Sequence, residues 1–257
     1  MPVLGLIEKI DGSWDSRQES AMSHRQITFQ TGHRWVVGSC GSGPALAATK
    51  AGNALEMCDL VEIRLDILAA AGAVDRSLWA HLTGVPLLFT ARCLAEGGAL
   101  ELTADQRVAL LTEALDDAAV LDVEVASMAA MDEIIGVAKT LGLPWVASFH
   151  DFDKLPATAV LEAAAQRARA AGAAAFKLAA RLHTPADVAR LADFQASDQG
   201  LPLATMGMGA LAPVSRLLCA QFGSVLNYGY LGETPTAPGQ WDSGLLKRAI
   251  AQLVMLG

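Results

Sequence analysis

Short runs of apolar, often β-branched residues recur along the chain, and longer stretches between them repeat apolar residues at helical spacing. The short runs predict strands and the longer stretches predict helices, for example TADQRVALLTEALDD (103–117) and TPADVARLADFQASD (184–198). In the second helix, Thr184 is expected to cap the amino end and Pro185 to take the first helical position. The predicted strands cover residues 34–40, 59–66, 86–92, 119–126, 144–151, 173–180, 202–208 and 224–230.

Eight strands in strict alternation with about eight helices predict an α/β protein whose single domain, residues 34–257, is a closed (β/α)8 TIM barrel. An open, doubly wound sheet is the alternative. It is disfavoured because the glycine-rich segment GSCGSGP (38–44) has neither the spacing of a dinucleotide fingerprint nor the lysine of a P-loop.

The first 33 residues are polar and stand outside this alternation. We expect residues 1–33 to be an N-terminal extension that is either flexible or folded into a small hairpin, with ITFQ (27–30) as one of its strands. Met22 offers an alternative start of the chain.

Composition narrows the class of protein. Hydrophobic residues make up 53% of the chain and aromatic residues only 5%, which favours alanine-rich helices packed closely on a sheet. A net charge of −8 argues against nucleic acid as a partner. Four separated cysteines indicate reduced thiols, and neither a signal peptide nor an uninterrupted apolar span is found, so we expect a cytoplasmic protein without membrane contact.

Lys177 stands in the middle of the apolar segment AAAFKLAA (173–180). Lysine is rarely buried without a partner, so one interpretation is that it ends a strand and extends its ammonium group into solvent. The other is that burial keeps the amine neutral for covalent chemistry. The segment alone favours the first interpretation.

Other polar residues gather at the carboxyl ends of the predicted strands, where barrel enzymes place their catalytic groups. Glu62, Arg64 and Asp66 alternate along the second strand and are expected to share a face. The others are Arg92 at the end of the third strand, Glu96 in the loop after it, Asp122 and Glu124 on the fourth, His150 and Asp151 ending the fifth, and Arg216 in the helix after the seventh.

Each of these residues also has a plainer explanation. An ion-pair layer that fills the barrel is an alternative explanation of Glu62, Arg64, Asp122 and Glu124. For Asp122 and Asp66 this explanation is as good as a functional one. Asp151 fits a local cap, a lone His150 a structural role, and a lone Arg216 a solvated helix position. Their joint placement at one end of one barrel favours a site.

The chemistry of that set is coherent. A buried lysine amine can attack a carbonyl and form an imine, a histidine beside it can transfer protons, and arginines can hold a carboxylate. No Cys/His cluster has metal-ligand spacing, so no metal is expected. The predicted class is imine chemistry on a carboxylated keto compound.

The segments EIRLD (62–66), FTAR with EGG (89–98), SFHDF (148–152), FKLA (176–179), SRL (215–217) and TAPGQ (236–240) resemble, in order, type I 3-dehydroquinate dehydratase. The resemblance runs from about Val36 to the C-terminus. It implies a (β/α)8 enzyme of the shikimate pathway that converts 3-dehydroquinate to 3-dehydroshikimate and water, without metal or cofactor. It also implies a homodimer, and it leaves open whether the enzyme serves biosynthesis or quinate breakdown.

The resemblance assigns a role to each matching position. Lys177 is similar to the imine-forming lysine, His150 to the proton-transfer histidine, and Glu96 to the acid beside that histidine. The positions that resemble substrate-binding residues are Glu62, Arg64, Arg92, Arg216, Thr236 and Gln240. Thr236 stands where many relatives have serine, and it keeps the hydroxyl.

Two other functions remain open. One is another lysine-imine barrel, an aldolase or transaldolase, although no phosphate site is evident after the seventh and eighth strands. The other is a non-catalytic barrel that binds an anion or a partner through the same pocket.

Overall fold

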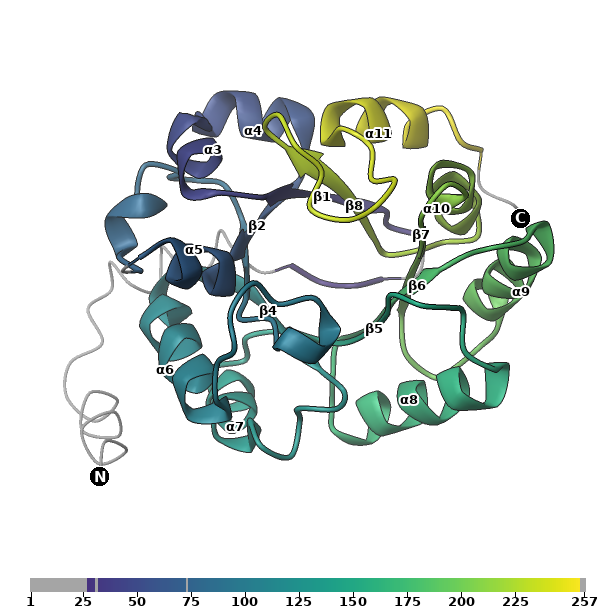
Figure 1. Ribbon diagram of the computed structural model, residues 1–257, viewed down its shortest axis with the longest axis horizontal. Coiled ribbons are helices and arrows are strands. Elements are labelled where there is room, and N and C mark those ends of the chain that lie inside the picture. The colour runs from purple at the N-terminus through teal and green to yellow at the C-terminus, as the bar shows by residue number, and fades with distance from the viewer. Residues whose placement is uncertain (1–26, 31, 73, 255–257) are drawn as a thin grey trace.

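The computed structural model describes residues 27–30, 32–72 and 74–254, and within them eight parallel strands form one sheet in the order β7-β6-β5-β4-β3-β2-β1-β8. The sheet curls into a barrel with helices outside it, so the predicted (β/α)8 fold is confirmed (Figure 1). The strands are β1 Trp35–Cys40, β2 Leu60–Arg64, β3 Leu87–Thr90, β4 Ala118–Glu124, β5 Trp145–Asp151, β6 Ala175–Arg181, β7 Leu203–Met208 and β8 Leu226–Leu231.

The barrel has a seam between its first and last members in the sheet order, β7 and β8. The other neighbouring strands are joined by parallel ladders, whereas β7 and β8 form no ladder in the described part of the chain. Where β7 and β8 begin, the N–H of Val225 donates to the carbonyl of Leu203 at 2.9 Å. This bond brings β8 back to β7 at the amino ends of the strands.

Helices follow the strands and cover the outside of the barrel. The two helices predicted from TADQRVALLTEALDD and TPADVARLADFQASD are confirmed, and Thr184 caps the second with Pro185 in its first turn. The α-helices are α3 Gly43–Ala48, α4 Ala51–Met57, α5 Leu65–Ala71, α6 Ala104–Ala114, α7 Asp132–Thr140, α8 Thr158–Ala170, α9 Pro185–Ala196, α10 Ala212–Gln221 and α11 Ser243–Ile250, and the 3-10 helices are η1 Arg76–Leu78, η2 Leu94–Glu96 and η3 Leu115–Asp117.

The strand β4 stops two residues early, at Glu124, and two other strands, β2 and β3, also end earlier than predicted. β2 stops at Arg64 and α5 begins at Leu65, so Asp66 lies in the first turn of a helix and does not continue the strand alternation. β3 stops at Thr90, which leaves Arg92 in the segment that leads to η2. The polar residues after both strands are therefore oriented by helix and loop geometry.

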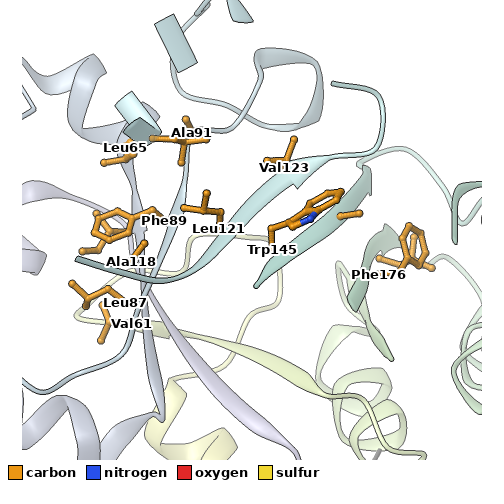
Figure 2. Packing of buried hydrophobic residues seen from close by; sticks show 14 of the residues in the cluster. Val61, Leu65, Leu87, Phe89, Ala91, Ala118, Leu121, Val123, Trp145 and Phe176 are labelled. Carbon is orange, nitrogen blue, oxygen red and sulfur yellow. The ribbon is translucent and has the colours of Figure 1, made fainter. Parts of the chain in front are cut away.

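The main core lies between the barrel and its helices. Outward-facing strand residues such as Phe89, Leu121, Trp145 and Phe176 are fully buried there, and Figure 2 shows them along neighbouring strands. Burying each large apolar side chain contributes roughly 1.5–3 kcal/mol. This outer core fixes the strands, and so it fixes where their inward residues meet.

Inside the barrel the inward positions change character along the strands. Near the amino ends they are apolar, with Leu60, Leu88, Val120 and Val146 in one buried cluster. One inward position further along, they become polar, as in Glu62, Thr90, Asp122, Ser148 and Lys177. The site therefore rests on an apolar floor and has buried charges above it.

The prediction of a hairpin strand at residues 27–30 is wrong, because this segment has no strand in the structure. Ile27 is instead buried with the apolar residues inside the barrel, and the carbonyl of Thr28 accepts a hydrogen bond from the indole of Trp35. The segment covers the amino end of the barrel, so hydrophobic contact determines its path. Residues 1–26, including Met22, lie outside the described residues.

Candidate active site

A cavity of about 120 Å³ opens at the carboxyl ends of the strands. All nine residues predicted for the site line it, although they come from six different strand–helix units. They are Glu62, Arg64, Arg92, Glu96, His150, Lys177, Arg216, Thr236 and Gln240. The structure therefore brings the whole predicted set together.

Lys177 points from β6 into the barrel and is only 4% exposed. Its Nζ lies 2.9 Å from Oδ2 of Asp122 and 4.3 Å from the centre of the Tyr228 ring. The interpretation that the ammonium group extends into solvent is therefore wrong. Burial lowers the pKa of Lys177, and the positive charge of Arg92 adds to this effect while Asp122 opposes it. The amine is neutral more often than that of an exposed lysine.

His150 and Glu96 form a second pair at the rim of the cavity. One carboxylate oxygen of Glu96 lies 2.9 Å from both the backbone N–H and Nδ1 of His150. Burial lowers the pKa of His150 well below its usual value, as do Arg92 and Lys177. Burial also raises the pKa of Glu96 to about 7, against the opposing effect of Arg92. The imidazole is thus neutral near pH 7, and Glu96 holds it by Nδ1 so that Nε2 remains for a substrate.

Arg92 connects two carboxylates of β4 with a hydroxyl group of β5. Its guanidinium lies 3.0 Å from Asp122 and 3.1 Å from Glu124, and it donates to Ser148 at 2.6 Å. Although burial acts in the opposite direction, Arg92 and Lys177 lower the pKa of Asp122. The Asp122 carboxylate therefore stays charged beneath the lysine.

Arg64 and Glu62 are held by neighbours on both sides. Arg64 binds both oxygens of Asp66, at 2.8 and 2.7 Å, and its guanidinium also donates to the carbonyl of Gly97. The buried carboxylate of Glu62 accepts hydrogen bonds from Ser39 and Thr90. These contacts fix the orientation of two groups that face the cavity, and the plainer explanation of Asp66 as an ion-pair partner is the one the structure supports.

Arg216 on α10 is 3% exposed and has no carboxylate partner within the described residues. One Nη atom donates to the carbonyl of Tyr228 at 2.6 Å and lies 3.6 Å from Sδ of Met206, while Nε is left without a partner. Burial lowers the pKa of Arg216 to about 10. A buried guanidinium with an unused donor next to a cavity is suited to bind an anion.

The loop after β8 closes one side of the cavity. Its Gln240 accepts hydrogen bonds through Oε1 from the N–H and the hydroxyl of Thr236, at 2.9 and 2.7 Å. The carbonyl of Pro238 accepts a bond from the N–H of Gly209 at 3.0 Å, and Gly239 has a φ of +74° directly against Gly209. This contact fixes the loop on the end of β7.

Several lining residues were missed from the sequence: Ser39, Phe152, Met206, Met208 and Tyr228. Tyr228 and Met206 occupy apolar strand patterns, which also describe a core, so no local signal separated them. The hydroxyl of Tyr228 is buried and finds no partner among the described residues. Phe152 lies on the backbone of Gly97, where a φ of +88° and the ring leave no room for a side chain.

The described residues lack two further features. No group of three or more His, Cys, Asp or Glu residues is arranged to hold a metal ion within residues 27–30, 32–72 and 74–254. Over the same residues, no helix is long and apolar enough to cross a membrane.

Comparison with known proteins gives one consistent result. The family model of type I 3-dehydroquinase matches residues 44–256. The 3-dehydroquinate dehydratase of Shouchella clausii (strain KSM-K16) is 35% identical over 195 residues, covering 71% of this chain and 76% of the relative. That of Methanosarcina barkeri (strain Fusaro / DSM 804) is 33% identical over 207 residues, covering 76% and 85%. The structure of the 3-dehydroquinate dehydratase from Enterococcus faecalis superposes with a TM-score of 0.72 at 25% identity, covering 88% of this chain and 95% of that one.

Proposed function

Because the chain belongs to the type I 3-dehydroquinase family, we propose that its cavity dehydrates 3-dehydroquinate through an imine on Lys177. The activity is that of a hydro-lyase, and the product is 3-dehydroshikimate. The observation that carries the assignment of roles is the position of Lys177, buried in the cavity beside a neutral histidine and an arginine without a carboxylate partner.

The covalent step begins at Nζ of Lys177. The neutral amine attacks the ring ketone carbon, and the carbonyl oxygen leaves as water once it has been protonated, which gives a protonated imine. This cation forms next to the Asp122 carboxylate and the face of Tyr228, at 2.9 and 4.3 Å from the nitrogen. Both contacts stabilise a positive charge at that nitrogen.

Proton transfer falls to His150. Its neutral imidazole removes a proton from the carbon next to the imine, and the electron pair moves into the imine to give an enamine. The imidazolium then returns the proton to the departing hydroxyl, so one base serves both steps. Glu96, bonded to Nδ1 at 2.9 Å, stabilises the charged imidazole between them. Water finally hydrolyses the imine and frees Lys177.

Arg216 is suited to hold the carboxylate of the substrate. It supplies a buried positive charge and an Nε–H that no described residue uses. Thr236 and Gln240 close over the same side of the cavity and offer a hydroxyl and an amide to the ring. Glu62, Arg64 and Arg92 also line the cavity and can contact the ring hydroxyls.

Trapping tests this function. Borohydride reduction in the presence of 3-dehydroquinate is expected to add substrate or product mass to one site, read by intact mass spectrometry, and Lys177→Ala should lose both the adduct and activity. Lys154→Ala is the matched control, because Lys154 follows β5 but does not line the cavity. An adduct that persists in Lys177→Ala would assign the imine to another lysine. An aldolase would instead release a carbon fragment, and a non-catalytic barrel would bind without an adduct.

Two further properties follow from the family resemblance and the cysteines. We infer a homodimer, to be measured by light scattering, and a cytoplasmic location, to be measured by fractionation. All four cysteines are free thiols, which suits a reducing compartment.

A further inference from the structure

A buried arginine outside the cavity connects to the imine-forming lysine through alternating charges. Arg107 lies on α6, is 3% exposed and does not line the cavity. Its Nε donates to the carbonyl of Ala91 at 2.6 Å, one Nη donates to Ser127 at 3.0 Å, and the other binds Oε2 of Glu124. The guanidinium is therefore fixed in direction as well as in position.

Glu124 connects Arg107 with the residues that line the cavity. Its second oxygen, Oε1, accepts from Nη1 of Arg92 at 3.1 Å and from the N–H of Cys93 at 3.0 Å. Arg92 in turn contacts Asp122, which contacts Lys177. Five buried groups thus alternate in charge from α6 to the cavity. The two carboxylates between the cations are completely buried, so each needs a positive neighbour.

We propose that Arg107 is a positioning residue of this site: by neutralising Glu124 it leaves Arg92 available to Asp122, and so it sets the charge that surrounds Lys177. This role rests on the proposed function of Lys177. The reason is that Arg92 contacts two carboxylates, those of Asp122 and Glu124. Without Arg107, Glu124 would keep Arg92 as its only cation and would draw it away from Asp122. Lys177 would then be the remaining cation in contact with Asp122.

The expected direction follows from all the groups that face the amine. Lys177 has Asp122 from β4, Glu62 from β2, Arg92 after β3, His150 on β5 and Tyr228 on β8 around it. Loss of Arg107 makes the site more negative and weakens the effect of Arg92. The pKa of Lys177 should therefore rise, and that of His150 should rise with it.

The test measures the amine directly and then the reaction. In the absence of substrate, Lys177 is labelled with acetic anhydride from pH 6 to 11, and peptide mass spectrometry gives the pH of half-maximal labelling. This pH is expected to rise by about 0.5–1 unit in Arg107→Met. The acid limb of kcat/KM should move to higher pH by a similar amount. Arg107→Lys, which keeps a charge near Glu124, should restore much of both values.

Removing the charge of Glu124 gives a second measurement. Glu124→Gln leaves Arg107 without its carboxylate partner and frees Arg92, so the labelling pH should fall. The double variant Arg107→Met/Glu124→Gln removes both charges, and its labelling pH should be close to that of the wild type. If Arg107→Met does not fold, the single variant Glu124→Gln still tests the proposal through the sign of its shift.

Arg190→Met is the matched control, because Arg190 on α9 also binds two backbone carbonyls and an aspartate but lies outside the alternating chain. It should leave the labelling pH unchanged. An unchanged labelling pH in folded Arg107→Met, or shifts of the same sign in Arg107→Met and Glu124→Gln, would overturn the proposal. Labelling that shifts as expected in a chain without dehydratase activity would instead refute the proposed function alone.

Discussion

At the scale of single residues, the site is arranged so that the pKa values of one amine and one imidazole are lowered. Burial lowers the pKa of both Lys177 and His150, and Arg92 adds to this effect on both while it keeps Asp122 charged. Both shifts favour the neutral forms that act as nucleophile and base. Glu96, whose pKa is raised to about 7, is the group of the site that titrates near neutral pH.

Replacement of His150 separates covalent chemistry from proton transfer. His150→Ala should still form a reducible adduct on Lys177, with the mass of intact substrate, because the amine keeps its surroundings. Turnover should fall at least about 10²- to 10⁴-fold, the usual contribution of a general base. Stopped assays combined with intact mass spectrometry measure both quantities.

His183→Ala is the matched control, since His183 is exposed and does not line the cavity. It should behave as wild type. In the wild type, the acid limb caused by His150 should lie below pH 6.5, because its pKa is lowered. Near-normal turnover by His150→Ala would make Glu96 the first candidate for the base.

At the scale of elements, the hydrophobic pattern was enough to predict which segments form strands, but it did not predict where each strand ends. The buried runs gave eight strand positions that the structure confirms. The polar–apolar alternation of EIRLD continues past Arg64, so it concealed the start of α5, and a pattern of period two carries no signal for the helix that begins there.

The same limit explains which site residues were found. Charged residues inside apolar strands, such as Lys177, are conspicuous in a sequence. Tyr228 resembles an ordinary core residue, and Arg107 resembles a solvated residue of a polar helix face. Their roles depend on which side of an element faces the barrel, and that is decided by packing between elements far apart in the chain.

The loop after β8 is an element whose position can be tested with one methyl group. In Gly239→Ala, the added carbon would clash with the carbonyl oxygen of Gly209, and the φ of +74° disfavours alanine. The strain of about 1–2 kcal/mol should displace the loop and raise KM by about 5- to 30-fold, with a smaller effect on kcat. Steady-state kinetics measure the change.

Gly142→Ala is the control for that experiment. Gly142 also has a positive φ, of +63°, but an added carbon there meets nothing within 4 Å. It should lower the melting temperature and leave KM unchanged. An equal rise of KM in both variants would mean that backbone strain, and not the contact with Gly209, disturbs the site.

At the scale of the whole molecule, His150 and Glu96 should affect stability in opposite directions. The folded state keeps His150 neutral, so stability is lost as the pH falls below 6.5, where the unfolded chain takes up a proton. Folded Glu96 takes up its proton near pH 7, before the unfolded chain does at 4.5, so stability is gained as the pH falls over that range. The two contributions oppose each other in the wild type.

Single substitutions should reveal each contribution. Relative to wild type, the free energy of unfolding of Glu96→Gln should drop by roughly 1–2 kcal/mol between pH 7 and pH 5, and that of His150→Ala should rise over the same range. Urea unfolding at both pH values measures this. Curves for the two variants that run parallel to the wild type would show that neither group changes its proton binding on folding.

Arg216 also has a structural role at the seam between β7 and β8. Where strand pairing is missing, its guanidinium touches Met206 of β7 and Tyr228 of β8, and so it fastens the open edge of the barrel from α10. If the same group holds the carboxylate of the substrate, occupancy of the cavity and closure of the cylinder become linked equilibria. The seam is then less stable in the free enzyme than in the substrate complex, and each bound substrate molecule stabilises it for the duration of one turnover.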